Sequence, residues 1–150
     1  MKIPAALKPP FIALFYLALA LALHFMWLQR GGVSFGNFLL GVLIVAAGFG
    51  IMTWAWKLFR RKGTSVCPFE ESTHFVQEGP YRFTRNPMYL GITLILLGIS
   101  FCAGTPPVFL APLAFFLTIH LLFIPYEEEK MERAFGEKYL NFKRRVRRWI

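Results

Sequence analysis

Four long apolar stretches divide the chain, at residues 11–28, 35–56, 87–103 and 107–125. A helix needs about 20 residues to cross the hydrocarbon of a bilayer, or somewhat fewer when flanking side chains reach the interface. Backbone polar groups in lipid must be paired internally, so each stretch is predicted to be a helix. The pattern predicts an all-α integral membrane protein, one domain over residues 1–150 with about four transmembrane helices.

The first three stretches have features beyond their apolar character. The first has a basic start and small residues, as a signal peptide does, but its length and the three stretches after it favour a span. The third is short, and it becomes a plausible span if its helix begins near Asn86. Small residues in the second stretch permit close helix contact, so a homodimer is one expectation; they are Gly41, Gly48 and Gly50.

The polarity pattern changes after the fourth stretch. Over residues 127–148 apolar side chains recur at spacings of three and four, at Met131, Phe135, Tyr139, Phe142 and Val146. Acidic residues come first and basic residues last, an order that complements the helix dipole. The pattern predicts a C-terminal amphipathic helix at the membrane surface.

The distribution of charge predicts the topology. The chain has 17 Lys and Arg and a formal net charge of +9. Four spans place all of these bases except Arg30 on one face, which is expected to be cytoplasmic. Both termini and a loop at residues 57–86 are predicted to lie on this face. The bases cluster at the membrane edge, where they contact anionic membrane lipid, so nucleic acid is not an expected partner.

Composition narrows the chemistry. Hydrophobic residues make up 56% of the chain, more than a soluble domain of 150 residues can bury. There is no Asp, so a Ser-His-Asp triad is excluded, and all eight acidic residues are Glu. Neither a phosphate-binding glycine loop nor a metal-ligand spacing is present, so no metal site is expected.

Polar residues gather in "GPYRFTRNPMYLG", residues 79–91, against the start of the third stretch. Gly79 and Pro80 predict a turn, Pro87 suits the first position of a helix, and Asn86 suits its N-cap. The start of a helix favours an anionic ligand group. Taken singly, the Tyr and Arg residues here also fit ordinary interfacial anchors.

Three consecutive glutamates follow the fourth stretch. Glu127 and Glu128 border the apolar face of the predicted tail helix and therefore need a partner, either the arginines of residues 79–91 or a bound cation. Glu129 lies on the far side and is expected to form a surface ion pair with Arg133. Within the spans, His24 and His120 are expected to face the bundle and pair with polar neighbours.

The segment 79–91 and the later "EEEKMERAFGEKYLNFKRRVRR" together resemble the isoprenylcysteine carboxyl methyltransferase family, a broad group of membrane methyltransferases that includes phospholipid N-methyltransferases. The resemblance covers roughly residues 73–148. It implies that S-adenosylmethionine binds between the last two spans and the tail. Carried over by position, the cofactor-binding residues are Thr73, His74, Phe75, Val76, Tyr81, Asn86, Pro87, Met88, Tyr89, Glu127 and Glu128, and the catalytic residues are Arg85 and Glu127.

The chemistry of the cofactor fits these residue types. Arg85 and the helix start suit its carboxylate, and Glu127 or Glu128 suits its ammonium group. Tyr81 and the tyrosine two residues after Pro87 suit the adenine or, by cation–π attraction, the sulfonium. Methyl transfer needs mainly positioning, because the sulfonium is already activated.

Two departures from the family pattern limit the substrate. Asn86 stands where many members have His, and Asn does not titrate near neutral pH, so a general base is not expected there. The arginine that contacts a prenylcysteine carboxylate has no match in "HLLFIP", so a prenylated protein substrate is not expected. We expect a methyltransferase acting on a small or lipid-like acceptor. The alternatives are a membrane reductase of the sterol reductase type with a nicotinamide cofactor, and a non-catalytic membrane scaffold.

Overall fold

The structure is a computed structural model of the chain, and it describes residues 8–61 and 76–150, apart from the side chain of Phe59. The described residues are helical and contain no strand, which confirms the all-α fold. The elements are α1 Pro9–Gln29, α2 Phe38–Arg61, a 3₁₀ turn Gly79–Arg82, α3 Pro87–Ala103, a 3₁₀ turn Pro106–Phe109, α4 Leu110–Thr118, a π turn Ile119–Phe123, α5 Ile124–Phe135 and α6 Glu137–Arg145.

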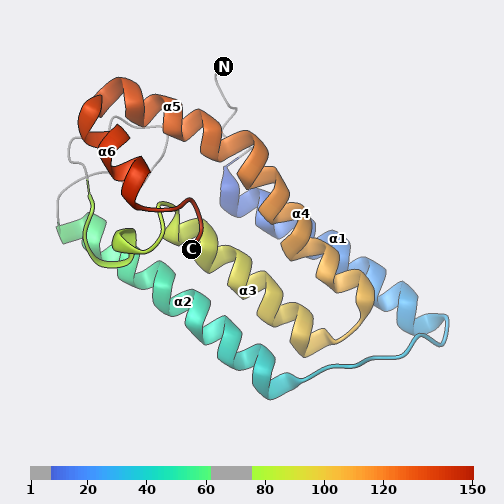
Figure 1. Cartoon of the computed structure of the whole chain (residues 1–150). Helices are drawn as coiled ribbons and strands as arrows, with labels where there is room; N and C mark the ends of the chain where they lie inside the picture. The colour runs from blue at the N-terminus through green and yellow to red at the C-terminus, as the bar shows by residue number, and fades with distance from the viewer. Residues whose placement is uncertain (1–7, 62–75) are drawn as a thin grey trace.

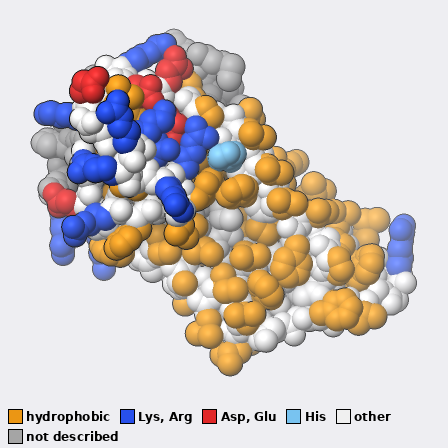
Figure 2. Space-filling view, viewed as in Figure 1, with side chains coloured by type: hydrophobic (Ala, Val, Ile, Leu, Met, Phe, Trp, Pro, Cys, Tyr) orange, Lys and Arg blue, Asp and Glu red, His pale blue; other side chains and the backbone are white. Residues whose placement is uncertain are grey.

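Four antiparallel helical rods make up the bundle. Figure 1 shows α3 between α2 on one side and α4 on the other, with α1 behind α4. Three rods, Pro9–Gln29, Phe38–Leu58 and Pro106–Phe135, are long and apolar enough to cross a membrane, whereas α3 has 17 residues. Apolar side chains cover the outside of the bundle and charged ones gather at one end, as expected for a protein with lipid as its solvent (Figure 2).

Glycines allow α2 and α3 to pack closely. A Cβ atom on Gly48 would lie 2.7 Å from the carbonyl oxygen of Gly91, and one on Gly98 would lie 2.6 Å from that of Gly41. Gly41 and Gly48 therefore face α3 of the same chain, which corrects their expected role between copies. Only Gly50 of the three glycines singled out in α2 has open space around it. The homodimer itself stays a prediction.

Polar pairs join α1 to the fourth rod and to the residue just before it. The hydroxyl groups of Tyr16 and Thr118 lie 2.8 Å apart, and Nδ1 of His24 lies 2.8 Å from Oγ1 of Thr105. Hydrogen bonds between helices contribute about 0.6–2 kcal/mol each in a membrane. The expectation that His24 pairs with a polar neighbour is confirmed.

A π turn carries the fourth rod through a proline. Pro125 has no N–H and its ring crowds the carbonyl group four residues earlier, which ordinarily breaks or kinks a helix. Here the N–H of Ile124 donates to the carbonyl oxygen of Ile119, five residues back, and the wider turn lets the helix continue to Phe135. The predicted fourth span, residues 107–125, is therefore continuous with the start of the predicted tail helix. At about 1.5 Å per residue the 30-residue rod is longer than the hydrocarbon is thick, so its end projects into water.

The tail forms two helices, where the sequence predicted one helix over residues 127–148. Gly136 has φ of 51°, a value that glycine adopts readily, and it ends α5. The chain then folds back, so that α6 lies near the start of α3 (Figure 1). Tyr139 and Phe142 of the predicted apolar face are buried. We call the polar end of the molecule, residues 57–61, 76–86 and 126–150, the head.

Candidate functional site

The site is built around residues 79–91. Gly79, with φ of 59°, begins a 3₁₀ turn, and the N–H of Thr84 closes the loop onto the carbonyl oxygen of Pro80. Helix α3 then begins at Pro87, as predicted. Asn86 occupies the N-cap position, but its side chain makes no capping hydrogen bond, so the predicted cap is corrected. The hydroxyl oxygen of Thr84 instead accepts from the backbone N–H of Asn86, at 3.2 Å.

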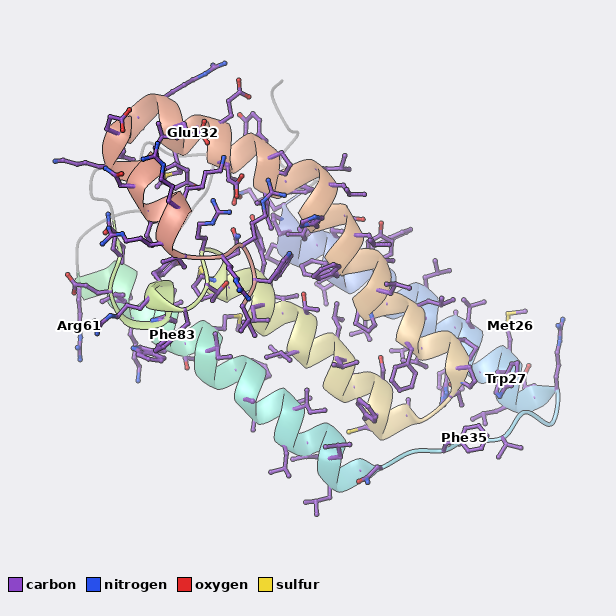
Figure 3. All side chains as sticks on the ribbon, viewed as in Figure 1. Met26, Trp27, Phe35, Arg61, Phe83 and Glu132 are labelled. Carbon is purple, nitrogen blue, oxygen red and sulfur yellow. The ribbon has the colours of Figure 1, made fainter. Side chains whose placement is uncertain are left out.

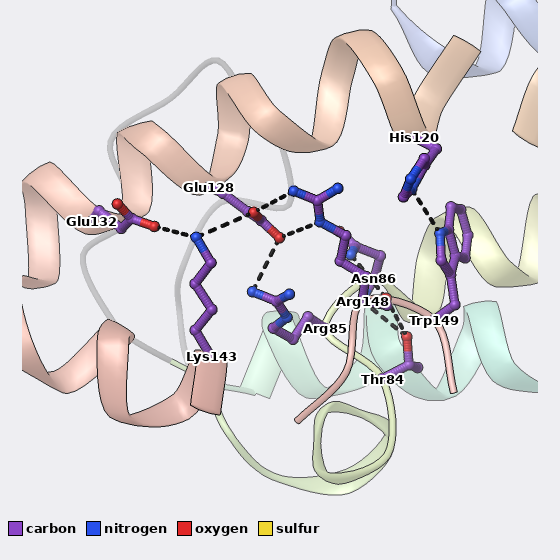
Figure 4. A network of polar contacts seen from close by, with 9 residues as sticks. All are labelled: Thr84, Arg85, Asn86, His120, Glu128, Glu132, Lys143, Arg148 and Trp149. Carbon is purple, nitrogen blue, oxygen red and sulfur yellow. Dashed lines mark hydrogen bonds and ion pairs between the residues drawn. The ribbon is translucent and has the colours of Figure 1, made fainter. Parts of the chain in front are cut away.

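A segment at the end of the chain makes contacts with this loop that sequence analysis did not predict. Residues 146–150, which we call the C-terminal segment, pass beside residues 84–86 (Figure 4). The N–H of Arg85 donates to the carbonyl oxygen of Arg147, at 3.0 Å. The hydroxyl of Thr84 and the side-chain amide of Asn86 both donate to the carbonyl oxygen of Arg148, each at 3.0 Å. The two motifs of the family-like region therefore meet through residues 84–86 and 147–148.

Glu128 is a buried carboxylate surrounded by three cations. It is 5% exposed, and Arg148 binds both of its oxygens, Nε at 2.9 Å and Nη2 at 2.8 Å. Nη1 of Arg85 lies 3.0 Å from Oε1, and Nζ of Lys143 lies 3.5 Å from Oε2. The hydrogen bond with Glu128 raises the pKa of Arg148. A buried carboxylate requires such compensation, so this cluster fixes α5, α6 and the start of α3 together.

The Arg85 side chain has buried N–H groups that no hydrogen bond satisfies among the described residues. Its side chain is 9% exposed, and its Nε and Nη1 atoms are buried without a hydrogen bond among the described residues, although Nη1 lies close to Glu128. Unsatisfied buried N–H groups are costly, since they have lost water and gained no acceptor. An anionic group bound beside Arg85 would satisfy them.

Glu127 has a different setting, among tyrosines. The phenol of Tyr89, itself 8% exposed, donates to Oε1 of Glu127 at 2.5 Å. Burial, and then the neighbouring Glu127 carboxylate, raise the pKa of the Tyr81 phenol, which therefore stays protonated at neutral pH. These three side chains come from the 3₁₀ turn, α3 and α5, so they meet only through the fold.

The structure thus brings together six of the predicted site residues: Tyr81, Arg85, Asn86, Tyr89, Glu127 and Glu128. Pro87 and Met88 belong to the first turn of α3, and Val76 is buried at the start of the second described range. Thr73, His74 and Phe75 lie outside the described residues. The predicted ion pair between Glu129 and Arg133 is confirmed, at 2.5 Å.

Sequence reasoning missed Thr84, Lys143, Arg148 and Trp149. Lys143 and Arg148 belong to a run of bases that is typical of a solvated, lipid-contacting surface. No periodicity in the sequence distinguishes these two, which contact Glu128, from their basic neighbours. Trp149 donates from Nε1 to Nδ1 of His120 at 3.2 Å and packs on Phe116, with ring centroids 4.6 Å apart. This contact supplies the polar neighbour expected for His120, from a direction that the sequence did not indicate.

Comparisons with known proteins place the chain among membrane methyltransferases. A family model described as "Phospholipid methyltransferase" matches residues 37–138, over half of the chain. An uncharacterized protein of Haemophilus influenzae is 38% identical over 63 residues, which is 42% of this chain and 100% of that protein. Protein-S-isoprenylcysteine O-methyltransferase B of Arabidopsis thaliana is 31% identical over 80 residues, which is 51% of this chain and 39% of that protein. No solved structure matches the chain.

Proposed function

Because the chain belongs to the phospholipid methyltransferase family and is a multi-pass membrane protein, we propose that it is an S-adenosylmethionine-dependent methyltransferase acting on a small or lipid-like acceptor. The observation that carries the proposal is the presence, at one end of the bundle, of a buried arginine whose Nε atom has no hydrogen bond among the described residues and of a carboxylate that accepts from a buried tyrosine. Arg85 provides the former and Glu127 the latter.

The residues present fit the proposed methyl donor. Arg85 and the N-terminal end of α3 would hold its carboxylate, since both favour an anion. Glu127 would hold its ammonium group, because Glu128 is already neutralised by Arg85, Arg148 and Lys143. Tyr81 and Tyr89 would line the adenine or the sulfonium. When bound, the donor supplies a methyl group on a sulfonium that needs no further activation.

The acceptor is proposed from the location of the site. Residues 84–89 and 127–128 stand where the apolar helices end and the charged head begins, and the charged end adjoins the apolar outside of the bundle (Figure 2). We propose that an amphiphilic molecule reaches the site from the membrane at this boundary. The Asn86 amide does not titrate near neutral pH, so it is not a general base. An acceptor that is already anionic, or that loses its proton to water, therefore fits best.

The proposed orientation places the head and both termini in the cytoplasm, because cytoplasmic loops of membrane proteins are enriched in Lys and Arg. All described Lys and Arg except Arg30 lie at the head end. Anionic membrane lipid is the proposed surface partner there.

Calorimetry with the purified protein in detergent tests the function. We expect binding of S-adenosylhomocysteine, the product form of the donor, and none of NADPH. Glu127→Gln should weaken it by about tenfold or more, since a hydrogen bond to a charged group contributes about 1.5–3 kcal/mol. Glu129→Gln is the matched control, because Glu129 is exposed and pairs only with Arg133 among the described residues.

The two alternatives have distinct outcomes in the same experiment. Binding of NADPH without S-adenosylhomocysteine would replace the proposal with the reductase. Binding of neither ligand would leave the non-catalytic scaffold. Equal affinities of the Glu127→Gln and Glu129→Gln variants would remove Glu127 from the site.

A further inference from the structure

The C-terminal segment is bound to the site through its backbone as well as its side chains. Two of its carbonyl oxygens accept three hydrogen bonds from residues 84–86. The side chain of Arg148 adds a bidentate ion pair with Glu128. Arg148 therefore contacts two elements: the loop before α3 through its carbonyl oxygen, and α5 through its guanidinium group (Figure 4).

These contacts determine how the side-chain amide of Asn86 is oriented. A carbonyl oxygen can only accept, so the amide must present its NH₂ group to Arg148. The Oδ1 atom of Asn86 then lies on the opposite branch of the amide. It accepts no hydrogen bond that caps α3. The acceptor of Asn86 is therefore not used to cap α3.

We propose that Arg148 is a positioning residue of the methyl-donor site: its carbonyl oxygen orients Asn86 so that Oδ1 accepts a hydrogen bond from an N–H group of the bound donor. The amino groups of S-adenosylmethionine, on its adenine and its amino acid end, are the class of partner. The guanidinium of Arg148 at the same time neutralises Glu128, which leaves Glu127 as the carboxylate for the ligand. This inference rests on the proposed function.

Aromatic packing holds the segment in place. The indole of Trp149 packs at a tilt against Phe116 of α4 and donates to His120 of the π turn. Both partners belong to the fourth rod, so the segment bridges that rod to the start of α3. Its position is fixed from both sides, which a positioning role requires.

Substitutions of Asn86 separate this role from helix capping. Asn86→His keeps a donor on one ring nitrogen and an acceptor on the other, so it should bind S-adenosylhomocysteine within about threefold of the unchanged protein. Asn86→Ala should lose about tenfold, and Asn86→Asp more, because a carboxylate repels the Arg148 carbonyl oxygen. A capping role predicts the reverse order for the last two, since Asp is a good N-cap and Ala a poor one.

A second set of variants addresses Arg148 itself. Arg148→Gln, and deletion of residues 148–150, should each weaken S-adenosylhomocysteine binding by about tenfold or more, since each removes the charged hydrogen bonds to Glu128. Arg144→Gln is the control, because Arg144 is exposed on the same run of bases. Calorimetry gives the affinities, and equal affinity in all three variants would overturn the inference.

A ligand-free measurement makes the result independent of the proposed function. The chain has three asparagines, at positions 37, 86 and 141, so ¹⁵N-asparagine labelling resolves the side-chain amide of Asn86 by NMR. Deletion of residues 148–150 should shift this signal and speed its hydrogen exchange, while Asn37 and Asn141 stay unchanged. An unaltered Asn86 signal would overturn the inference even if no ligand binds, whereas a shifted signal without any binding would count against the proposed function alone.

Discussion

Glu127 and Glu128 of α5 are consecutive in the chain, yet their side chains have different surroundings. Glu127 accepts a hydrogen bond from Tyr89, and Glu128 lies among Arg85, Lys143 and Arg148. Successive residues of a helix point about 100° apart, so one side chain faces α3 and the other faces α6. This separation gives Glu128 a structural role in the head, and it agrees with the ligand-binding role proposed for Glu127.

Removal of the charge on Glu128 is expected to destabilise the protein. Glu128→Gln leaves Arg85 buried without a counter-ion, and breaking a buried pair in this way costs about 3–5 kcal/mol of unfolding free energy. Glu129→Gln should cost less than about 1 kcal/mol, because its ion pair with Arg133 is exposed. Unfolding by SDS in mixed micelles measures both values. Equal effects of the two substitutions would show that the Glu128 cluster is not a stabilising feature.

At the scale of elements, the α2–α3 pair depends on small residues. The two helices are antiparallel, and glycines seven residues apart in each of them bring the backbones into contact twice. Without a hydrophobic driving force between helices in lipid, such close packing is a main source of attraction. This pair fixes the position of α3, and with it the start of α3 in the site.

Alanine substitutions on α2 should show this dependence. In Gly48→Ala the new Cβ would meet the Gly91 carbonyl oxygen at 2.7 Å, so the helices must separate, at a cost of about 1–3 kcal/mol. Gly50→Ala has open space and should be neutral or stabilising by about 0.5–1 kcal/mol. The two substitutions have the same chemistry on the same helix. SDS unfolding compares them, and a loss of stability in Gly50→Ala as large as that in Gly48→Ala would refute the packing argument.

At the scale of the whole molecule, charge is segregated to one end. Figure 3 shows Met26, Trp27 and Phe35 at the end of the bundle far from Arg61 and Glu132. Residues 9–29, 38–56, 87–103 and 106–125 contain no Lys or Arg. Every described base lies at the head end except Arg30, which follows α1. The molecule is therefore polar along its long axis, with lipid around its middle.

Limited proteolysis in sealed proteoliposomes tests this segregation without assuming an orientation. Trypsin added to vesicles with the head outside should release several head fragments, because the exposed bases lie there. Trypsin added to vesicles of the opposite orientation should cut only after Arg30, as the bilayer shields the head. Mass spectrometry identifies the cuts, and a second cut from the side opposite the head would contradict the four-rod topology.

Sequence analysis identified features that depend on local pattern and missed those that depend on the folded arrangement. The apolar stretches, the start of α3 at Pro87 and the surface pair of Glu129 follow from spacing along the chain. By contrast, Gly136 interrupts a continuous amphipathic period, and only its left-handed φ shows that the tail folds back. Arg148 could not be distinguished among its basic neighbours, because its partners are 20 to 64 residues away in sequence.

The π turn at Ile119–Phe123 has a consequence for changes in chain length. In an α-helix each residue turns the chain by about 100° and advances it by about 1.5 Å. Loss of one residue from this turn would shorten the rod by a distance that a bilayer tolerates. It would also swing Glu127 and Glu128 about a quarter of the way round the rod, away from Tyr89 and Arg148. A single insertion or deletion in this turn therefore rotates the head relative to the membrane.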